Sequence, residues 1–397
     1  MKLWQVKSSR SQVADLIQNF TVGDDFIIDS HFLPYDLAAS LAHAKMLFKM
    51  KLITPKELHN IKRGLNEIKK QWLQGKFAVK KSDEDMHTAI ENYLTEKYGS
   101  AGEKIHTGRS RNDQILVAVW LFLKQELRAT LKEMGALQKI LGIFIRQCGN
   151  APMPGYSHQQ RGMPITVGIW AAAFAESLKD DKTIVKAAVQ VIDQSPLGSG
   201  AGFGVPIKLD RELTAKLLKF QRVQKNPLYC QNSRGKFENI ALQAIGNVML
   251  TLNKLAVDIL LFTTKEFNFF SVPESLTTGS SIMPQKRNLD VAEILRGKTK
   301  LFFGYQQQIQ SLFLDLMSGY NRDLQLTKKP LIEAFNTAKE SIRAAILLMS
   351  KIKPNKKMLK KACEGDILAA KKVYKLVEKG IPFRQAYKKV KKSLTKT

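Results

Sequence analysis

The stretch TTGSSIMPQKRNLD, residues 277–290, interrupts a chain that otherwise has helical patterning over most of its 397 residues. Gly279 allows backbone N–H groups to approach a ligand closely. Ser280 offers a hydroxyl, Lys286 a positive charge and Asn288 an amide donor. A loop with these groups is suited to hold a carboxylate and to stabilise negative charge that builds up on it. Helix capping explains one or two of these residues, but not the whole string.

Helix-start signals are clear on the N-terminal side of the chain. Thr54 is a predicted N-cap, and Glu57 stands at the position that completes a capping box. A second helix is predicted to begin after Ser82 or Asp83, in the segment SDEDMHTAIENYL. Both helices place apolar residues three and four positions apart, which buries one face of each.

Longer apolar segments with helical spacing fill the middle of the chain. Helices of more than about 20 residues that are apolar on more than one face are typical of a buried bundle. Few segments alternate apolar and polar residues between flanking turn residues, so few strands are expected. We therefore predict an all-α protein with a core of long helices. The segments are 114–141, 164–192, 235–265 and 290–316.

The net charge is unusually positive, because 63 Lys and Arg residues face 35 Asp and Glu residues, which gives +28. From Lys351 onward there are 16 basic and 3 acidic residues, a net of 16 − 3 = +13. A field of this size attracts polyanions and anionic substrates. Two interpretations stay open: nonspecific polyanion binding, nucleic acid included, and a solvated lysine-rich surface.

Several other classes of protein are not supported by the sequence. The longest apolar run that we identify, 165–175, is too short for a membrane span. Three widely spaced cysteines predict neither a disulfide framework nor a metal site, and a reducing cytoplasm is expected. The glycine-rich stretch GSGAGFG, 198–204, lacks the flanking strand and helix of a dinucleotide site, so a loop is predicted there.

Two further polar stretches break the helical pattern. HTGRSRND, 106–113, places Ser110, Arg111 and Asn112 directly before an apolar helix, where they are suited to bind a carboxylate or phosphate. A capped helix start with exposed arginines is the alternative. MPGYSHQQRGMP, 153–164, holds His158 between two prolines, where it is suited to exchange protons near neutral pH. A structural turn histidine is the alternative.

Together, these three loops resemble those of the argininosuccinate lyase family in the fumarase/aspartase superfamily. GSSIMPQKRN matches the superfamily signature GSSxMPxKxN, and HTGRSRND and PGYSHQQR resemble two further family motifs. DEDMHTAIENYL, SPLGSGAG and YNRDLQ resemble family segments in the expected order. The resemblance extends from about residue 30 to residue 394.

The resemblance implies a fold of three mostly helical domains. We expect an N-terminal domain over 1–105, a central five-helix bundle over 106–350, and a short, basic C-terminal helical region over 351–397. Four subunits are expected to form a homotetramer with a twenty-helix core. Each active site would then collect loops from three subunits.

The resemblance also implies elimination of fumarate from argininosuccinate, a step of arginine biosynthesis, without metal or organic cofactor. Ser280 would be the general base, and Lys286 and Asn288 would stabilise the carboxylate as it gains negative charge. His158, paired with Glu293, would help to protonate the leaving nitrogen, directly or through water. Residues implied to bind substrate are Asp29, His106, Ser110, Arg111, Asn112, Ser157, Asn288, Tyr320, Gln325 and Lys328.

The chain departs from the family pattern at five positions. Asp25 replaces a serine, Ser157 a threonine, Gly235 and Thr327 aspartates, and Leu289 a proline. Most of these changes are at positions expected to contact the amine half of the substrate, while the residues expected to act on its dicarboxylate half are retained. The alternatives are therefore a lyase for another N-substituted succinate, or a non-catalytic family member with a binding or structural role.

Overall fold

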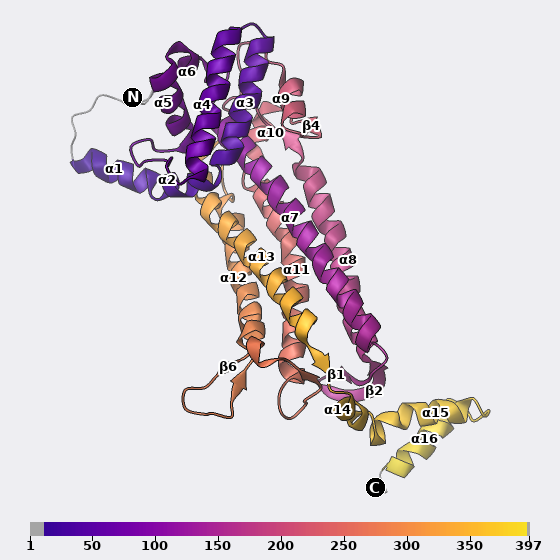
Figure 1. Cartoon of the computed structure of the whole chain (residues 1–397). Helices are drawn as coiled ribbons and strands as arrows, with labels where there is room; N and C mark the ends of the chain where they lie inside the picture. The colour runs from indigo at the N-terminus through magenta and orange to yellow at the C-terminus, as the bar shows by residue number, and fades with distance from the viewer. Residues whose placement is uncertain (1–11, 395–397) are drawn as a thin grey trace. The chain divides into compact units, whose positions relative to one another are not determined.

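The computed structural model describes residues 12–394, and these residues are mostly α-helical (Figure 1). This confirms the predicted fold class. The chain forms two compact units. The first comprises Met1–Ala129, Val185–Ala244 and Gly304–Phe335, and the second comprises Thr130–Ile184, Ile245–Phe303 and Asn336–Thr397.

Long helices contribute residues to both units, because the division falls inside each of them. Four match the predicted apolar segments, and a further one, α13, was not predicted individually. Its first two turns mix polar and apolar residues, and its only long apolar run, AAILLM, covers just 344–349. The long helices are α7 (Arg111–Cys148), α8 (Val167–Ile192), α11 (Lys236–Phe262), α12 (Asp290–Leu312) and α13 (Lys328–Lys351).

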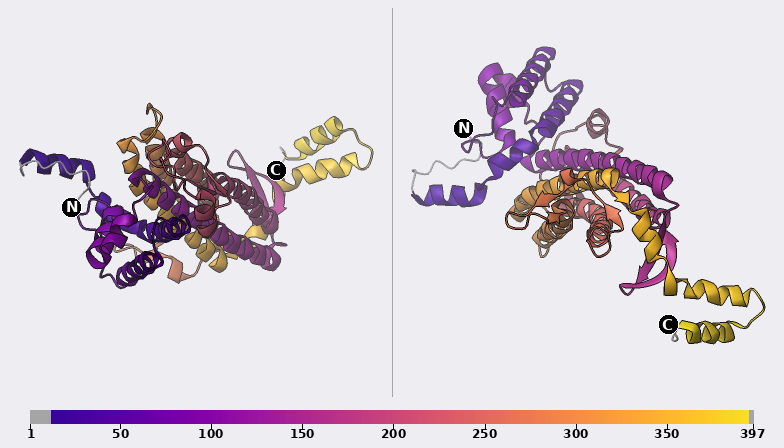
Figure 2. Two further views of the ribbon diagram at one scale, coloured as in Figure 1. Left: turned by 90° about the horizontal axis from the view of Figure 1, so that it is seen from above. Right: turned by 60° about the horizontal axis from the view of Figure 1, so that its bottom comes forward.

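Shorter helices precede and connect the long ones. The N-terminal ones are α1 (Gln12–Val22), α2 (Asp25–Ile28), η1 (Asp29–His31), α3 (Leu33–Lys49), α4 (Pro55–Leu73), α5 (Met86–Tyr98) and α6 (Ser100–Lys104). The connecting ones are α9 (Arg211–Leu217), α10 (Pro227–Asn232), η2 (Glu274–Leu276) and η3 (Arg322–Thr327). The C-terminal ones are α14 (Lys356–Ala362), η4 (Gly365–Leu368), α15 (Ala369–Val377) and α16 (Phe383–Leu394), of which α15 and α16 lie side by side (Figure 2).

Two N-terminal helix starts test the capping predictions. The Thr54 hydroxyl accepts a hydrogen bond from the Glu57 N–H at 3.2 Å, and the Glu57 carboxylate accepts one from the Thr54 N–H at 2.7 Å. The predicted capping box of α4 is therefore confirmed. The prediction for α5 was wrong by two or three residues: its N-cap is Asp85, whose carboxylate accepts a hydrogen bond from the Thr88 N–H at 2.8 Å.

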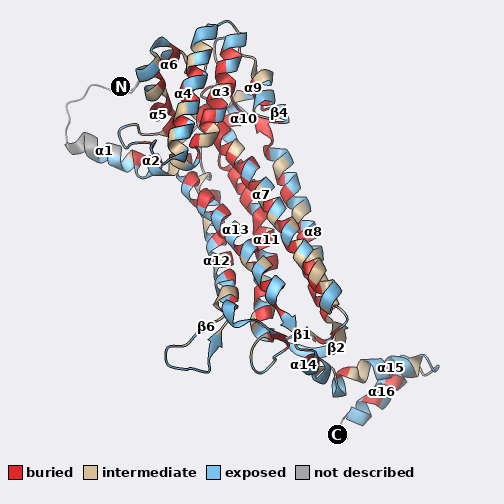
Figure 3. Cartoon of the chain, viewed as in Figure 1, coloured by how far each residue is buried: buried red, intermediate tan, exposed pale blue. Residues whose placement is uncertain are grey.

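Each unit has its own aromatic core, and buried residues line the inner faces of the long helices (Figure 3). In the first unit, the ring centroids of Trp120 and Phe237 lie 5.0 Å apart, and this contact joins α7 to α11. In the second unit, the Trp170 ring packs 4.9 Å from Phe270 and donates a hydrogen bond to Asp258 at 2.9 Å. This stacking fixes the helices against one another within each unit.

One long helix corrects an expectation about membranes. α11 is long and apolar enough to cross a membrane, although no such segment was identified from the sequence. Of its most apolar 18-residue window, 56% is buried inside the chain. The core helix of a soluble protein meets the same criterion, so this one helix is weak evidence for a membrane span.

The described strands form two-stranded sheets. The largest is a hairpin of β1 (Pro152–Ser157) and β2 (Gln160–Thr166), which is antiparallel with an irregularity between Pro154 and Tyr156. β6 (Thr278–Gly279) pairs with β7 (Arg287–Asn288), also antiparallel. The others are the parallel pair β3 (Gln194–Ser195) and β4 (Arg222–Val223), and the antiparallel pair β5 (Phe270–Ser271) and β8 (Lys353–Pro354).

Candidate active site

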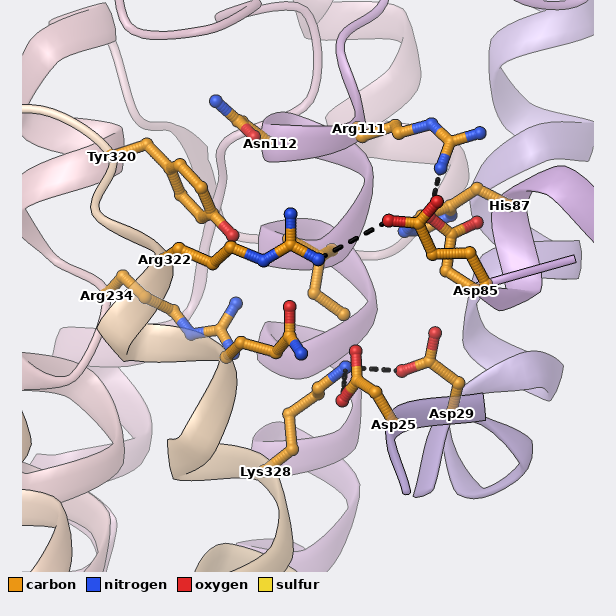
Figure 4. Close-up of a pocket in the computed structure, with 13 residues that line it drawn as sticks. Asp25, Asp29, Asp85, His87, Arg111, Asn112, Arg234, Tyr320, Arg322 and Lys328 are labelled. Carbon is orange, nitrogen blue, oxygen red and sulfur yellow. Dashed lines mark hydrogen bonds and ion pairs between the residues drawn. The ribbon is translucent and has the colours of Figure 1, made fainter. Parts of the chain in front are cut away.

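A polar cavity of about 270 Å³ lies within the first unit (Figure 4). Segments distant in sequence supply its walls: α2 and η1, the start of α5, the start of α7, and the turn that leads into α13. Six residues implied by the family resemblance line it together: Asp29, Arg111, Asn112, Tyr320, Gln325 and Lys328. The other lining residues are Asp25, Glu84, Asp85, His87, Ile115, Arg234 and Arg322.

The floor of this cavity is a buried ion cluster. The Lys328 ammonium lies 2.5 Å from an Asp25 oxygen and 2.6 Å from an Asp29 oxygen. Burial raises the pKa of Asp25 to about 6, the Lys328 charge opposes this rise, and the Asp29 charge adds to it. Burial also opposes the charged form of Lys328, but the two carboxylates raise its pKa above the ordinary value. Two carboxylates on one cation leave the cluster with a negative charge when all three groups are ionised.

A second ion pair positions the helix starts. The Arg111 guanidinium pairs with Asp85, the N-cap of α5, and donates to the Thr88 hydroxyl at 2.5 Å. Behind Asp85, the buried His87 ring pairs with Asp36 at 2.7 Å. Burial opposes the charged form of both partners, yet their mutual attraction raises the pKa of His87 and lowers that of Asp36. These contacts fix the polar wall on the side of α5.

The opposite wall comes from the turn before α13. Gln325 donates a hydrogen bond to the Thr21 carbonyl at 3.0 Å, and Arg322 donates to the same carbonyl at 3.2 Å. The buried Arg234 pairs with Glu238 at 2.7 Å and donates to the Leu324 carbonyl at 3.0 Å. Arg234 thereby holds the η3 turn in place.

The departures Gly235 and Thr327 lie next to Arg234. Arg234 donates to the Thr327 hydroxyl at 3.3 Å, and the Gly235 N–H donates to Glu238 at 2.8 Å. Gly235 has φ +75°, and a β-carbon there would lie 2.8 Å from that of Phe313. The local packing therefore excludes an aspartate at position 235 unless the neighbouring chain shifts.

Two predicted binding residues, His106 and Ser110, support the cavity without lining it. His106 pairs with Glu91 at 2.8 Å, and the Ser110 hydroxyl accepts a hydrogen bond from the Asn112 N–H at 3.3 Å. Nearby, the buried Asp113 carboxylate accepts hydrogen bonds from the N–H groups of Gly198 and Gly200, at 2.8 and 3.1 Å. The glycine-rich stretch is thus a loop, as predicted.

Ser157 and His158 belong to the second unit, at the exposed end of the β1–β2 hairpin. His158 and Gln159 form its two-residue turn, with φ of +51° and +59°. Positive φ at both positions is the pattern of a type I′ turn, which presents the imidazole on a tight hairpin. Within residues 12–394, no hydrogen bond or ion pair joins the side chains of His158 and Glu293.

The signature loop is a short ribbon, also in the second unit, closed by β6 and β7. The Ser280 hydroxyl is half-buried and accepts hydrogen bonds from the N–H groups of Ile282 and Met283, at 3.4 and 3.2 Å. Thr278 donates to Asp290 across the ribbon, and Lys286 projects into solvent. Two backbone N–H groups therefore donate to the Ser280 oxygen.

A cavity of about 610 Å³ lies at the base of this ribbon. Asn288 and Glu293 line it, together with Arg287 and Arg296. The Arg287 guanidinium pairs with Glu274 at 3.0 Å. Among the described residues, no group of three or more His, Cys, Asp or Glu side chains is arranged to hold a metal ion.

Sequence analysis did not identify five polar cavity residues: Glu84, Asp85, His87, Arg234 and Arg322. A signal for the first three was available, because they lie in DEDMHTAIENYL, the segment already quoted for its family resemblance. Arg322 likewise lies in YNRDLQ. Their roles depend on pairings across the cavity, which the sequence does not encode locally.

Comparisons with known proteins show the family of the chain. A family model described as a lyase matches residues 4–304. The argininosuccinate lyase of Thermotoga neapolitana is 43% identical over 389 residues, which are 98% of this chain and 97% of the relative. That of Phocaeicola vulgatus is 39% identical over 98% of this chain and 86% of the relative.

Solved structures share the fold. EDDS lyase in complex with formate aligns with a TM-score of 0.79 and 23% identity, covering 97% of this chain and 76% of that one. Class II fumarase from Schistosoma mansoni aligns with a TM-score of 0.77 and 16% identity, covering 95% of this chain and 91% of that one. The chain belongs to the argininosuccinate lyase family of the fumarase/aspartase superfamily and is a carbon–nitrogen lyase.

Proposed function

We propose that this enzyme cleaves argininosuccinate to arginine and fumarate. The observation that carries this proposal is the 43% identity to an argininosuccinate lyase over 98% of the chain. The residues that the chemistry requires are all retained, namely Ser280, His158, Lys286, Asn288 and Glu293.

The reaction begins when Ser280 removes a proton from the succinyl carbon next to a carboxylate. A serine hydroxyl is a weak base in water, so it must be activated by its surroundings. The N–H groups of Ile282 and Met283 donate to its oxygen and favour the negatively charged form. Lys286 and Asn288 stabilise the aci-carboxylate that forms. The C–N bond then breaks, and the leaving nitrogen takes a proton from His158 as fumarate forms.

The cavity of the first unit suits the amino-acid end of the arginine half. Its ammonium group fits the negatively charged Asp25–Asp29–Lys328 cluster, and its carboxylate fits Arg111 and Arg322. Tyr320 and Gln325 add hydroxyl and amide groups on the same side. Charges of both signs in one cavity are expected to select a zwitterion over an uncharged amine.

Assembly completes the site. We propose a cytoplasmic homotetramer in which each active site combines loops from three copies of the chain. This accounts for His158 and Ser280, which are presented on separate exposed turns. It also accounts for exposed apolar residues along the long helices, such as Ile169, Leu250 and Ile294.

A second candidate is elimination from another N-substituted succinate. The observation that favours it is Asp25, which occupies a serine position and binds Lys328 directly. The additional carboxylate of Asp25 makes the part of the cavity that would bind the amine half of the substrate more negative.

Fumarate release, followed by its ultraviolet absorbance, tests both candidates. Purified protein is supplied with argininosuccinate and, in parallel, with a panel of succinyl-amines. We expect the highest kcat/KM with argininosuccinate. A higher kcat/KM with another succinyl-amine would favour the second candidate, and no release from any of them by a folded tetramer would refute both.

A further inference from the structure

The C-terminal helices α15 and α16 form an antiparallel hairpin with its own small core (Figures 1 and 2). Val373, Ala386 and Val390 are buried in it, and Leu376 and Ile381 pack against them. The aliphatic side chains of both helices are therefore turned toward each other. The outer surface of the hairpin carries mainly polar and aromatic residues, together with the exposed Leu394.

That outer surface is strongly basic. Between positions 369 and 394 there are nine Lys and Arg residues and one acidic residue, Glu378, a net of 9 − 1 = +8. Lys371, Lys375 and Lys388 are exposed, and no ion pair engages them within the described residues. No ion pair among residues 12–394 neutralises their charge, so it is available to an anionic partner.

Aromatic rings lie among these cations. The ring centroids of Tyr374 and Phe383 are 5.9 Å apart, and those of Phe383 and Tyr387 are 6.3 Å apart. The three residues are 57%, 50% and 52% exposed, respectively. This row of half-exposed rings leaves apolar surface in water, which is costly unless a partner covers it.

We propose that this hairpin binds single-stranded nucleic acid. Successive bases would stack on the rings of Tyr374, Phe383 and Tyr387, and phosphates would lie on the neighbouring lysines. Proteins that bind single strands without sequence preference combine these two features, a basic surface and stacking aromatics. The proposal concerns a surface separate from the residues assigned to catalysis, so it stands whether or not the proposed substrate is correct.

An anionic membrane surface fits the hairpin less well. A helix that lies in a membrane interface places its aliphatic and aromatic residues on one face, opposite the lysines. Here the aliphatic residues Val373, Ala386 and Val390 face the inside of the hairpin. The exposed rings are interspersed with Lys and Arg residues, an arrangement that matches alternating bases and phosphates.

The test is fluorescence anisotropy of a labelled oligothymidylate of about 20 nucleotides titrated with the full-length protein. The double substitution Phe383→Ala and Tyr387→Ala is expected to raise the Kd for the oligonucleotide about tenfold or more at fixed salt. Fumarate release should be unchanged. Both rings are half-exposed and outside the hairpin core, so circular dichroism should show the same helix content.

A second pair of variants tests the charge contribution and is independent of the aromatic side chains. Lys388→Gln with Lys389→Gln should reduce the slope of log K against log salt by about 1.4, since each phosphate contact on a single strand contributes about 0.7. The matched control is Lys69→Gln with Lys70→Gln, two adjacent exposed lysines on α4. That control should leave both affinity and slope nearly unchanged.

Four outcomes would overturn the proposal. The first is the absence of oligonucleotide binding at low salt. The second is an equal loss in the α4 control, which would assign binding to the total charge of +28. The third is unchanged affinity in the aromatic variant. The fourth is binding to anionic phosphatidylserine vesicles that the oligonucleotide does not displace.

Discussion

The ion cluster of Asp25, Asp29 and Lys328 allows a direct test through Asp25→Asn. The substitution keeps the shape of the side chain and removes one of the two negative charges on Lys328. Because burial raises the pKa of Asp25 from 3.8 to about 6, the ionised form is disfavoured in the folded protein. An amide at this position avoids that cost while its oxygen still accepts a hydrogen bond from Lys328.

The size of the effect follows from linkage. A carboxyl group whose pKa is raised on folding stabilises the fold fully below its unfolded pKa and loses that contribution as the pH rises through the folded value. For Asp25 the loss occurs between about pH 4 and pH 6, and the difference between 3.8 and about 6 corresponds to about 3 kcal/mol. The variant should therefore be more stable than the parent by up to about 3 kcal/mol at pH 8, and nearly equal to it at pH 4.

Thermal unfolding at equal protein concentration measures this difference. For 397 residues, an unfolding entropy of about 2.1 cal/mol/K per residue converts about 3 kcal/mol into a rise in Tm of about 4 °C at pH 8. The control is Asp29→Asn, which should lower Tm, because Asp29 accepts hydrogen bonds from both Lys328 and the Met86 N–H. A lower Tm for Asp25→Asn at pH 8 would refute the reasoning.

Two further substitutions test local packing and capping. Gly235→Asp, which restores the residue usual in the family, should lower the free energy of unfolding by about 1–3 kcal/mol, because its β-carbon would meet that of Phe313. Chemical denaturation measures this loss. The control is Gly297→Ala on α12, where no atom lies within 4 Å of the added β-carbon, so no loss of stability is expected. Thr54→Ala should cost about 1 kcal/mol by removing the hydroxyl that caps the Glu57 N–H, and a cost near zero would show that the capping box does not stabilise α4.

Much of the helical fold follows from the sequence, because long apolar repeats are a strong signal. The α5 start was misplaced because Ser82, Asp83 and Asp85 are all suitable caps, and only three-dimensional contacts select the last. The β1–β2 hairpin was missed because its strands contain prolines and lack alternation. Its turn also uses His158 and Gln159 in place of the usual asparagine and glycine.

The candidate site was predictable as a set of residues, but not as a set of contacts. Asp29 and Lys328 are 299 positions apart, and no local pattern links them. The family resemblance named both, yet it did not predict that Asp25 would share the same ammonium group. Arg322 and Glu84, 238 positions apart, pair across the cavity in the same way.

The central claim is that Ser280 is the base of an elimination that yields fumarate. The most direct measurement is fumarate release from argininosuccinate by the parent, by Ser280→Ala and by Ser281→Ala, with Tm recorded for each. We predict that Ser280→Ala loses turnover while it retains the parent Tm within about 1 °C, because a surface loop contributes little to stability. Ser281→Ala should retain turnover. Undiminished turnover in Ser280→Ala would contradict the account.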